Sequence, residues 1–147
     1  MLTDGSFEDR LLSWSLLRDR IKVSDAHLMD LTSAYNEVQR KSMRYDPWDQ
    51  KNWPTPWEII DNNHYCGFTI TLAMWFTLFY TNRIGAKRNE IWITKNTNGG
   101  NTNYLLRIDD KILGYSNNLS CIKVSALPET EIVQKIFELN NKEHNGK

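Results

Sequence analysis

The sequence predicts a single α+β domain, because helical and strand-like patterns occupy separate parts of the chain. Three observations support this class. Helical periodicity fills the N-terminal half, a long segment apolar on every side follows it, and short alternating segments separated by turn residues come after residue 89. Segregated helices and strands are typical of a domain in which helices pack on an antiparallel sheet. The length of 147 residues suits one domain, residues 1–147.

Helices are expected throughout residues 1–45. The first is predicted over residues 7–20, where leucines and tryptophan recur with helical spacing. The second begins with Ser24 as N-cap and an acidic residue in the first turn, and it continues toward residue 43. It should end before Pro47, because the residue that precedes a proline avoids the helical conformation.

Residues 46–126 form the expected core of the domain. Thr55, Pro56 and Glu58 have the order of an N-cap, a first helical position and an acid in the first turn, which predicts a short helix. A longer helix begins at Cys66 and is apolar nearly all round, so it should be the central helix. Strands are expected at four places, the last being the least regular: residues 90–94, 103–108, 111–115 and 119–124.

The last segment, residues 127–147, is expected to form a helix through Leu139 followed by a frayed tail. Leu127, Pro128 and Glu129 have the composition of a helix start. The apolar residues that follow recur with spacings compatible with one helical face: Ile132, Val133, Ile136, Phe137 and Leu139.

Composition narrows the classes of function. Lys plus Arg and Asp plus Glu number 18 each, so the sequence lacks the basic surface that nucleic acid or an anionic membrane selects. The acidic N-terminus does not follow the signal-peptide pattern, and the apolar run over residues 70–80 is shorter than the roughly 20 residues that span a bilayer. Cys66 and Cys121 give neither a disulfide framework nor a zinc site, although one bridge between them is compatible with the count. We therefore expect a cytoplasmic protein without metal or cofactor, in which Cys121 is structural.

Cys66 raises the question of catalysis, because the N-terminus of a helix favours the thiolate form of a cysteine. A cysteine hydrolase also needs a base, an orienting acid or amide and an oxyanion hole. The three histidines are His27, on an early helix, His64, two residues before the cysteine, and His144, in the tail. None of them is expected to reach the sulfur.

The segment WPTPWEIIDNNHYC resembles the transglutaminase-like cysteine proteinases of bacteria. Trp53, Thr55, Pro56 and Glu58 match the pattern W-x-T-P-x-E, which in that family precedes an apolar pair, G-D-C-E-D and a helix. The resemblance covers about residues 46–120. It implies a papain-related core in which the cysteine-bearing helix packs on a three- to four-stranded antiparallel sheet. The chain is also similar to small proteins of tailed bacteriophages.

The resemblance implies that the catalytic machinery of the family is incomplete here. Cys66 takes the place of the nucleophile, Asn103 that of the histidine in H-x-V-L, and Gly114 that of the acid in V-L-D-N. Tyr65 and Gly67 flank the cysteine where the family has acidic residues. Asparagine cannot take a proton from a thiol at neutral pH, and glycine cannot orient an imidazole.

We therefore expect a non-catalytic transglutaminase-like domain that acts as a structural or assembly subunit. The phage resemblance implies a virion component of the tail, baseplate or neck, present in the host cytoplasm during assembly. Its partners would be other protein subunits, in a homo- or hetero-oligomer, and neither nucleic acid nor membrane. The candidate binding residues, besides the first two helices, are Trp48, Trp53, Trp57 and Glu58.

Alternatives remain open at the level of sequence. The tryptophans around residue 53 can simply pin an irregular loop. An active cysteine peptidase, amidase or acyltransferase would use Cys66 as nucleophile, with Asn103 or His64 in support. A third reading is a small domain that binds a peptide strand at a vestigial cleft.

Overall fold

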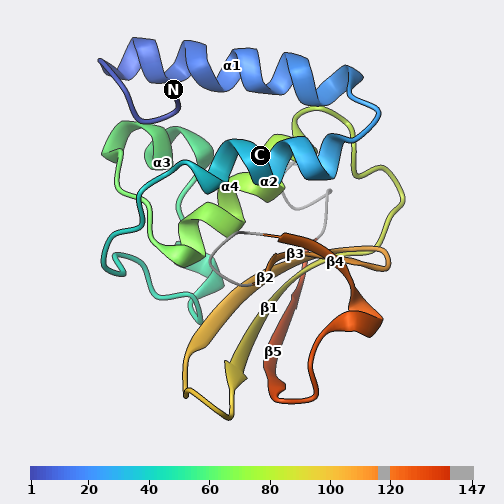
Figure 1. Ribbon diagram of the computed structural model, residues 1–147. Helices are drawn as coiled ribbons and strands as arrows, with labels where there is room; N and C mark the ends of the chain where they lie inside the picture. Colours follow the sequence, from blue (N-terminus) through green and yellow to red (C-terminus); the bar gives the residue numbers. More distant parts are fainter. Residues whose placement is uncertain (116–119, 140–147) are drawn as a thin grey trace.

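The computed structural model, which describes residues 1–115 and 120–139, has a layer of helices on one face of a sheet (Figure 1). The helices are α1 (Phe7–Val23), α2 (His27–Asn36), α3 (Pro56–Asn62) and α4 (Gly67–Phe79), with short 3-10 turns η1 (Gln50–Asn52) and η2 (Val124–Ala126). The strands are β1 (Asn89–Asn96), β2 (Thr102–Ile108), β3 (Lys111–Tyr115), β4 (Ser120–Lys123) and β5 (Glu131–Glu138). The predicted α+β class is confirmed.

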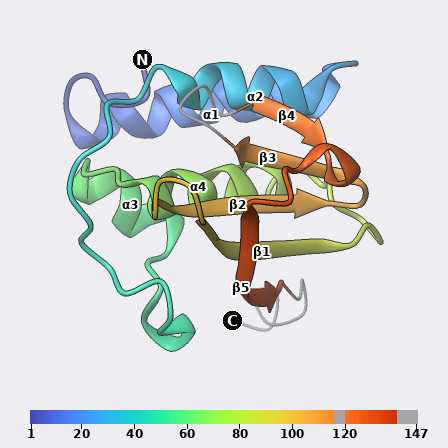
Figure 2. The same cartoon turned by 60° about the horizontal axis from the view of Figure 1, so that its bottom comes forward.

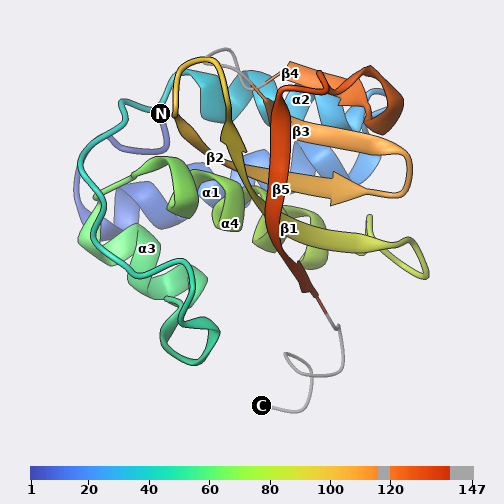
Figure 3. The same ribbon diagram turned by 90° about the horizontal axis from the view of Figure 1, so that it is seen from below.

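The sheet has the order β4-β3-β2-β1-β5, and each neighbouring pair is antiparallel. Helix α4 lies against the central strand β2, and α2 lies against β3 and β4 (Figure 2). Strand β5 runs at a steep angle to β2 and β3 (Figure 3). The register of β1 and β5 shifts between Ile93 and Thr94, and such a bulge increases the local twist of a sheet.

Residues 131–138 form strand β5, so the expected C-terminal helix over residues 127–139 is wrong. Ile132, Val133 and Ile136 are β-branched, which favours a strand, and their spacing did not distinguish the two periods. These three side chains stay 39–47% exposed, so they do not form the buried face of a helix. The strand instead completes the edge of β1, which makes the described sheet five-stranded rather than three- or four-stranded. The predicted tail, residues 140–147, lies outside the described residues.

The other predicted elements are present, with one shorter helix. Helix α2 ends at Asn36 rather than near residue 43. The backbone N–H of Lys41 donates to the carbonyl of Tyr65 at 2.7 Å, which holds the chain after α2 against the start of α4 instead of in a helix. The other strands and helices begin and end within a few residues of their expected positions.

Helix α3 begins with Thr55 as its N-cap, as the sequence predicts, and Glu58 completes a capping box. The backbone N–H of Glu58 donates to Thr55 Oγ1 at 3.2 Å, and the N–H of Thr55 donates to Glu58 Oε1 at 2.9 Å. Pro56 occupies the first helical position, where a missing N–H costs nothing. Asn63 ends the helix in the left-handed conformation, with φ of 49°.

The main core lies between the helices and the sheet. Every residue of α4 from Phe68 to Leu78 is buried, which confirms the central position predicted for this helix. It packs on apolar side chains of the sheet that include Ile91, Leu106 and Leu113. A smaller cluster lies on the outer face of the sheet, away from the helices, and contains Trp92, Leu105 and Ile112.

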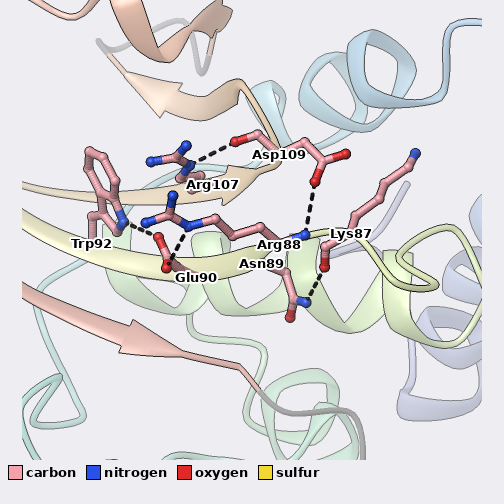
Figure 4. Close-up of polar contacts among 7 residues, drawn as sticks. All are labelled: Lys87, Arg88, Asn89, Glu90, Trp92, Arg107 and Asp109. Atoms are coloured by element: carbon pink, nitrogen blue, oxygen red, sulfur yellow. Dashed lines mark hydrogen bonds and ion pairs between the residues drawn. The ribbon is translucent and has the colours of Figure 1, made fainter.

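The outer face also holds a paired carboxylate at the start of β1 (Figure 4). Glu90 is 3% exposed, and its two oxygens accept from Arg88 Nε at 2.9 Å and Trp92 Nε1 at 2.8 Å. Asp109, in the turn after β2, accepts from the backbone N–H of Arg88 at 2.9 Å, and its carbonyl accepts from Arg107 Nε at 2.7 Å. These bonds join the start of β1 to the β2–β3 turn.

Across the described residues, no helix has both the length and the hydropathy needed to cross a bilayer.

Candidate cysteine site

Cys66 is the N-cap of α4, and the side chain of Thr69 holds it there. The backbone N–H of Cys66 donates to Thr69 Oγ1 at 2.9 Å, and that hydroxyl donates to the carbonyl of Cys66 at 3.2 Å. A polar side chain three residues into the helix is thus bonded back to the capping residue, as in a capping box. The prediction that Cys66 opens the central helix is confirmed.

Within the described residues, the buried sulfur of Cys66 contacts a hydroxyl and a thioether. The residue is 2% exposed. Its Sγ lies 3.5 Å from Thr69 Oγ1 and 3.9 Å from Met43 Sδ. A hydroxyl and a thioether are very weak bases at neutral pH, so neither contact generates the thiolate that acts as nucleophile.

Tyr104 of β2, rather than Asn103, lies against the start of α4. A methyl group on Gly67 would be 3.7 Å from Cδ2 of Tyr104, and the centroids of the Tyr104 and Phe68 rings are 5.8 Å apart. Burial, and next the neighbouring Cys66 and Asp46, raise the pKa of the Tyr104 phenol. The phenol therefore keeps its proton at neutral pH and is no base for the thiol.

Asn103 points to the opposite face of the sheet. Its Nδ2 donates to the carboxylate of Glu131, at 3.1 Å from Oε2 and 3.3 Å from Oε1. The same carboxylate accepts from Thr94 Oγ1 at 2.7 Å and from Asn96 Nδ2 at 2.7 Å. Glu131 is 6% exposed, and these neutral donors satisfy it. Because successive side chains alternate across a strand, the position that faces Cys66 is 104, one residue beyond the position that the motif indicated.

Gly114 lies on the helix side of the sheet, close to Tyr104. A Cβ built on it would be 3.3 Å from the carbonyl oxygen of Tyr104 and 3.8 Å from both Thr71 Oγ1 and Met74 Cε. Its φ of +95° is a conformation that side-chain-bearing residues rarely adopt. The structure thus brings positions 66, 104 and 114 to one side of the sheet, filled by a thiol, a phenol and no side chain.

The two described histidines are bonded elsewhere. Nε2 of His64 lies 2.8 Å from the carbonyl oxygen of Ser42. Nδ1 of His27 accepts from Arg83 Nη2 at 2.7 Å, in the loop that follows α4 and so at the end of that helix opposite to Cys66. An open hollow of about 590 Å³ lies at this same distant end, lined by residues 82–87 and Asp109. His144 is outside the described residues.

The four predicted binding residues differ in their contacts and exposure. Trp53 packs between Phe68 and Phe137, with ring centroids 5.2 and 4.9 Å apart, and its Nε1 donates to the carbonyl of Pro47 at 3.0 Å. Glu58 serves the cap of α3. The other two tryptophans are partly exposed, Trp48 by 51% and Trp57 by 46%.

Trp57 belongs to a separate aromatic group at the junction of α1, α3 and the end of α4. Its ring meets that of Trp14 edge-on, with centroids 5.5 Å apart, and that of Tyr80 at 6.0 Å. Of the four predicted binding residues, Trp48, Trp57 and Glu58 are exposed, and Trp53 is partly buried.

Both cysteines are free, so the alternative of a bridge between them is not realised. Burial is the main reason why the pKa of the Cys121 thiol is raised, and this half-buried residue packs against the main core. Among residues 1–115 and 120–139, no group of three or more His, Cys, Asp or Glu side chains is placed to hold a metal ion.

The comparison with solved structures decides the fold. The chain folds like LapG of Legionella pneumophila. The calcium-bound structure of LapG matches with a TM-score of 0.67 and 17% identity, over 91% of this chain and 77% of that one. A second LapG structure matches with a TM-score of 0.66 and 16% identity, over 97% and 84%. The EGTA-treated form gives 0.65 and 16%, over 92% and 78%.

These matches confirm the transglutaminase-like fold that the WPTPWE segment indicated, and at this identity they show the fold alone. No family model matches the sequence, and no curated protein matches it significantly. The motif had indicated the cysteine and the helix it opens. The motif had not indicated Tyr104, Thr69 or Met43. The alternation of side chains along β2 could have indicated Tyr104, because a one-residue shift decides which side chains face the helices.

Proposed function

We propose that this chain is a non-catalytic transglutaminase-like domain that acts by binding other proteins as an assembly subunit. One observation carries the proposal: the sulfur of Cys66 contacts Thr69 and Met43, and the side chain that β2 places against the start of α4 is the phenol of Tyr104. LapG is a transglutaminase-like cysteine protease, so the fold is compatible with chemistry at this cysteine. Fold does not carry function, however, and the groups around the sulfur here do not support proton transfer.

Apolar side chains on the surface support a binding role. Leu12, Leu16, Val23 and Met29 of α1 and α2 are 60–78% exposed. Trp48 and Trp57 add exposed aromatic area, and large aromatic residues often anchor protein interfaces. The balanced charge of 18 basic and 18 acidic residues fits protein partners better than nucleic acid. We further propose that the assembly is a phage virion, and this part of the proposal rests on the resemblance of the sequence to small proteins of tailed bacteriophages.

The test is purification of the chain from its native source under non-denaturing conditions, together with a Cys66→Ser variant. We expect a particle or complex of defined stoichiometry whose assembly is unchanged by the substitution. A monomer that cleaves or crosslinks peptides, and that loses this activity in Cys66→Ser, would establish the alternative of an active cysteine enzyme.

A further inference from the structure

Helix α1 is apolar on two opposite faces. Trp14, Leu17 and Ile21 are buried, with exposed fractions of 2, 6 and 0%, whereas Leu12 and Leu16 are each 60% exposed. At about 100° per residue, the exposed leucines lie on the side of the helix opposite to the buried residues. Figure 1 shows α1 as the outermost helix, at the edge of the layer away from the sheet. An apolar stripe at such a position is typical of an interaction site.

The two charged residues that flank the exposed leucines along α1 have opposite signs. Residues 8, 12, 16 and 20 are each four apart, so Glu8, Leu12, Leu16 and Arg20 form one ridge on the helix surface. All four are exposed. The ridge begins with an acid in the first turn and ends with a base in the last turn. The order acid, leucine, leucine, base is complementary to itself when it is read in the reverse direction.

We propose that α1 pairs with α1 of a second copy of this chain, antiparallel and about a two-fold axis between Leu12 and Leu16. Leu12 of each copy then packs against Leu16 of the other, and Glu8 of each copy meets Arg20 of the other. A two-fold axis makes each contact twice, as in most homodimers. Two ridges of residues four apart pack at a crossing angle of about 50° with the helix axes about 8–10 Å apart.

The charges select this arrangement over the parallel one. In a parallel pair, Glu8 would face Glu8 and Arg20 would face Arg20, and like charges placed together at an interface disfavour that partner geometry. A partner of different sequence would need no such symmetry in the ridge. The self-complementary order therefore points to a second copy as the occupant. The inference rests on the proposed binding role and names its partner.

The test is analytical ultracentrifugation of the purified chain over a concentration series up to roughly 100 μM, where a complex with a micromolar Kd is mostly assembled. We expect a dimer. Leu16→Glu should weaken it by more than about 100-fold, because it replaces both Leu12–Leu16 contacts beside the two-fold axis and buries two carboxylates among apolar side chains. The matched control is Ile132→Glu on β5, which changes a side chain that is 47% exposed and belongs to the sheet rather than to α1, and should leave the Kd unchanged.

A charge exchange tests the antiparallel order. Glu8→Arg and Arg20→Glu should each weaken the dimer by about tenfold, since each creates two like-charge contacts, and the double variant should recover to within about threefold of the native Kd. Circular dichroism of each variant checks that α1 still folds. A monomeric chain at the highest concentration, a dimer indifferent to Leu16→Glu, or single charge variants that the double variant does not rescue would each overturn the pairing. So would a chain that binds a different protein through this ridge while staying monomeric.

The experiments test the dimer proposal and the non-catalytic proposal independently. A monomer in which Cys66 is unreactive would overturn the pairing of α1 and leave the non-catalytic proposal intact. A dimer in which Cys66 turns over a peptide would overturn the non-catalytic proposal and leave the pairing intact.

Discussion

The hydroxyl oxygen of Thr69 lies 3.5 Å from the sulfur of Cys66 and 2.9 Å from its backbone nitrogen. The cap that starts α4 therefore also supplies the nearest polar neighbour of the thiol. The same hydroxyl lies 3.2 Å from the carbonyl of Cys66, to which it donates its proton. A group used in this way holds the cysteine in place and does not accept a proton from it. The contacts of Thr69 thus serve both the cap of α4 and the surroundings of the thiol.

Tyr104→His should partly restore reactivity, because it places an imidazole on the strand face that packs against the start of α4. We expect Cys66 of the folded variant to react with iodoacetamide about tenfold faster at neutral pH, below the ~10²–10⁴ of a well-positioned base, since Gly114 offers no acid to orient the ring. Asn103→His is the matched control and should have no effect, because position 103 faces Glu131 on the other side of the sheet. An equal gain from both variants would contradict the assignment of position 104.

Gly114→Ala should destabilise the fold by about 1–3 kcal/mol. The φ of +95° is strained for alanine, and the added Cβ would lie 3.3 Å from the carbonyl oxygen of Tyr104. Urea unfolding measures the loss. Gly99→Ala is the control, since its Cβ would meet only the end of the Asn101 side chain at 3.5 Å, and it should stay within about 0.5 kcal/mol of the native chain. If the two substitutions cost the same, the backbone of Gly114 is not what excludes a side chain from position 114.

Glu131→Gln should cost about 1–3 kcal/mol of unfolding free energy, because the new amide NH₂ would face the N–H and O–H donors that the carboxylate now satisfies. Those donors come from Thr94, Asn96 and Asn103. The exposed Glu129→Gln serves as the control and should be neutral. A neutral Glu131→Gln would show that these bonds do not contribute to holding β5 on the sheet.

Acid should weaken the fold through His27. Burial, followed by the charges of Arg83 and Lys87, lowers the pKa of this imidazole below its ordinary value of 6.5, even though Asp30 acts in the opposite direction. The unfolded chain therefore binds the proton more readily, and the free energy of unfolding should fall as the pH drops from 7 through 6.5 and down to the lowered pKa. His27→Gln should flatten this part of the pH profile, measured by urea unfolding between about pH 7 and 5.5. A profile unchanged by the substitution would exclude His27 as its source.

Local patterns predicted α3 and α4 well. The capping box at Thr55 and the apolar character of residues 68–78 depend on near neighbours, so the sequence specifies them directly. The strand β5 was missed for a physical reason. Ile132, Val133 and Ile136 suit either period, and the open edge of β1 that accepts them is a tertiary feature.

The candidate site was predicted in part. The WPTPWE segment and Cys66 indicated the fold and the place of the thiol, because both belong to contiguous chain. The facing residue could not be fixed in the same way, since a motif aligned one position early exchanges the two faces of a strand, here Asn103 for Tyr104. The contact of Met43 with the sulfur arises from the non-helical segment after α2, which the expected longer helix did not foresee.

The most direct measurement is the rate at which iodoacetamide alkylates Cys66 in the folded chain relative to the same chain in urea, in a Cys121→Ser background. The folded rate should be the lower of the two at neutral pH, because the thiol is 2% exposed and its sulfur contacts a hydroxyl and a thioether. A folded rate well above the unfolded one would mean that the native structure activates the sulfur. That result would contradict the non-catalytic proposal and favour the alternative of an active cysteine enzyme.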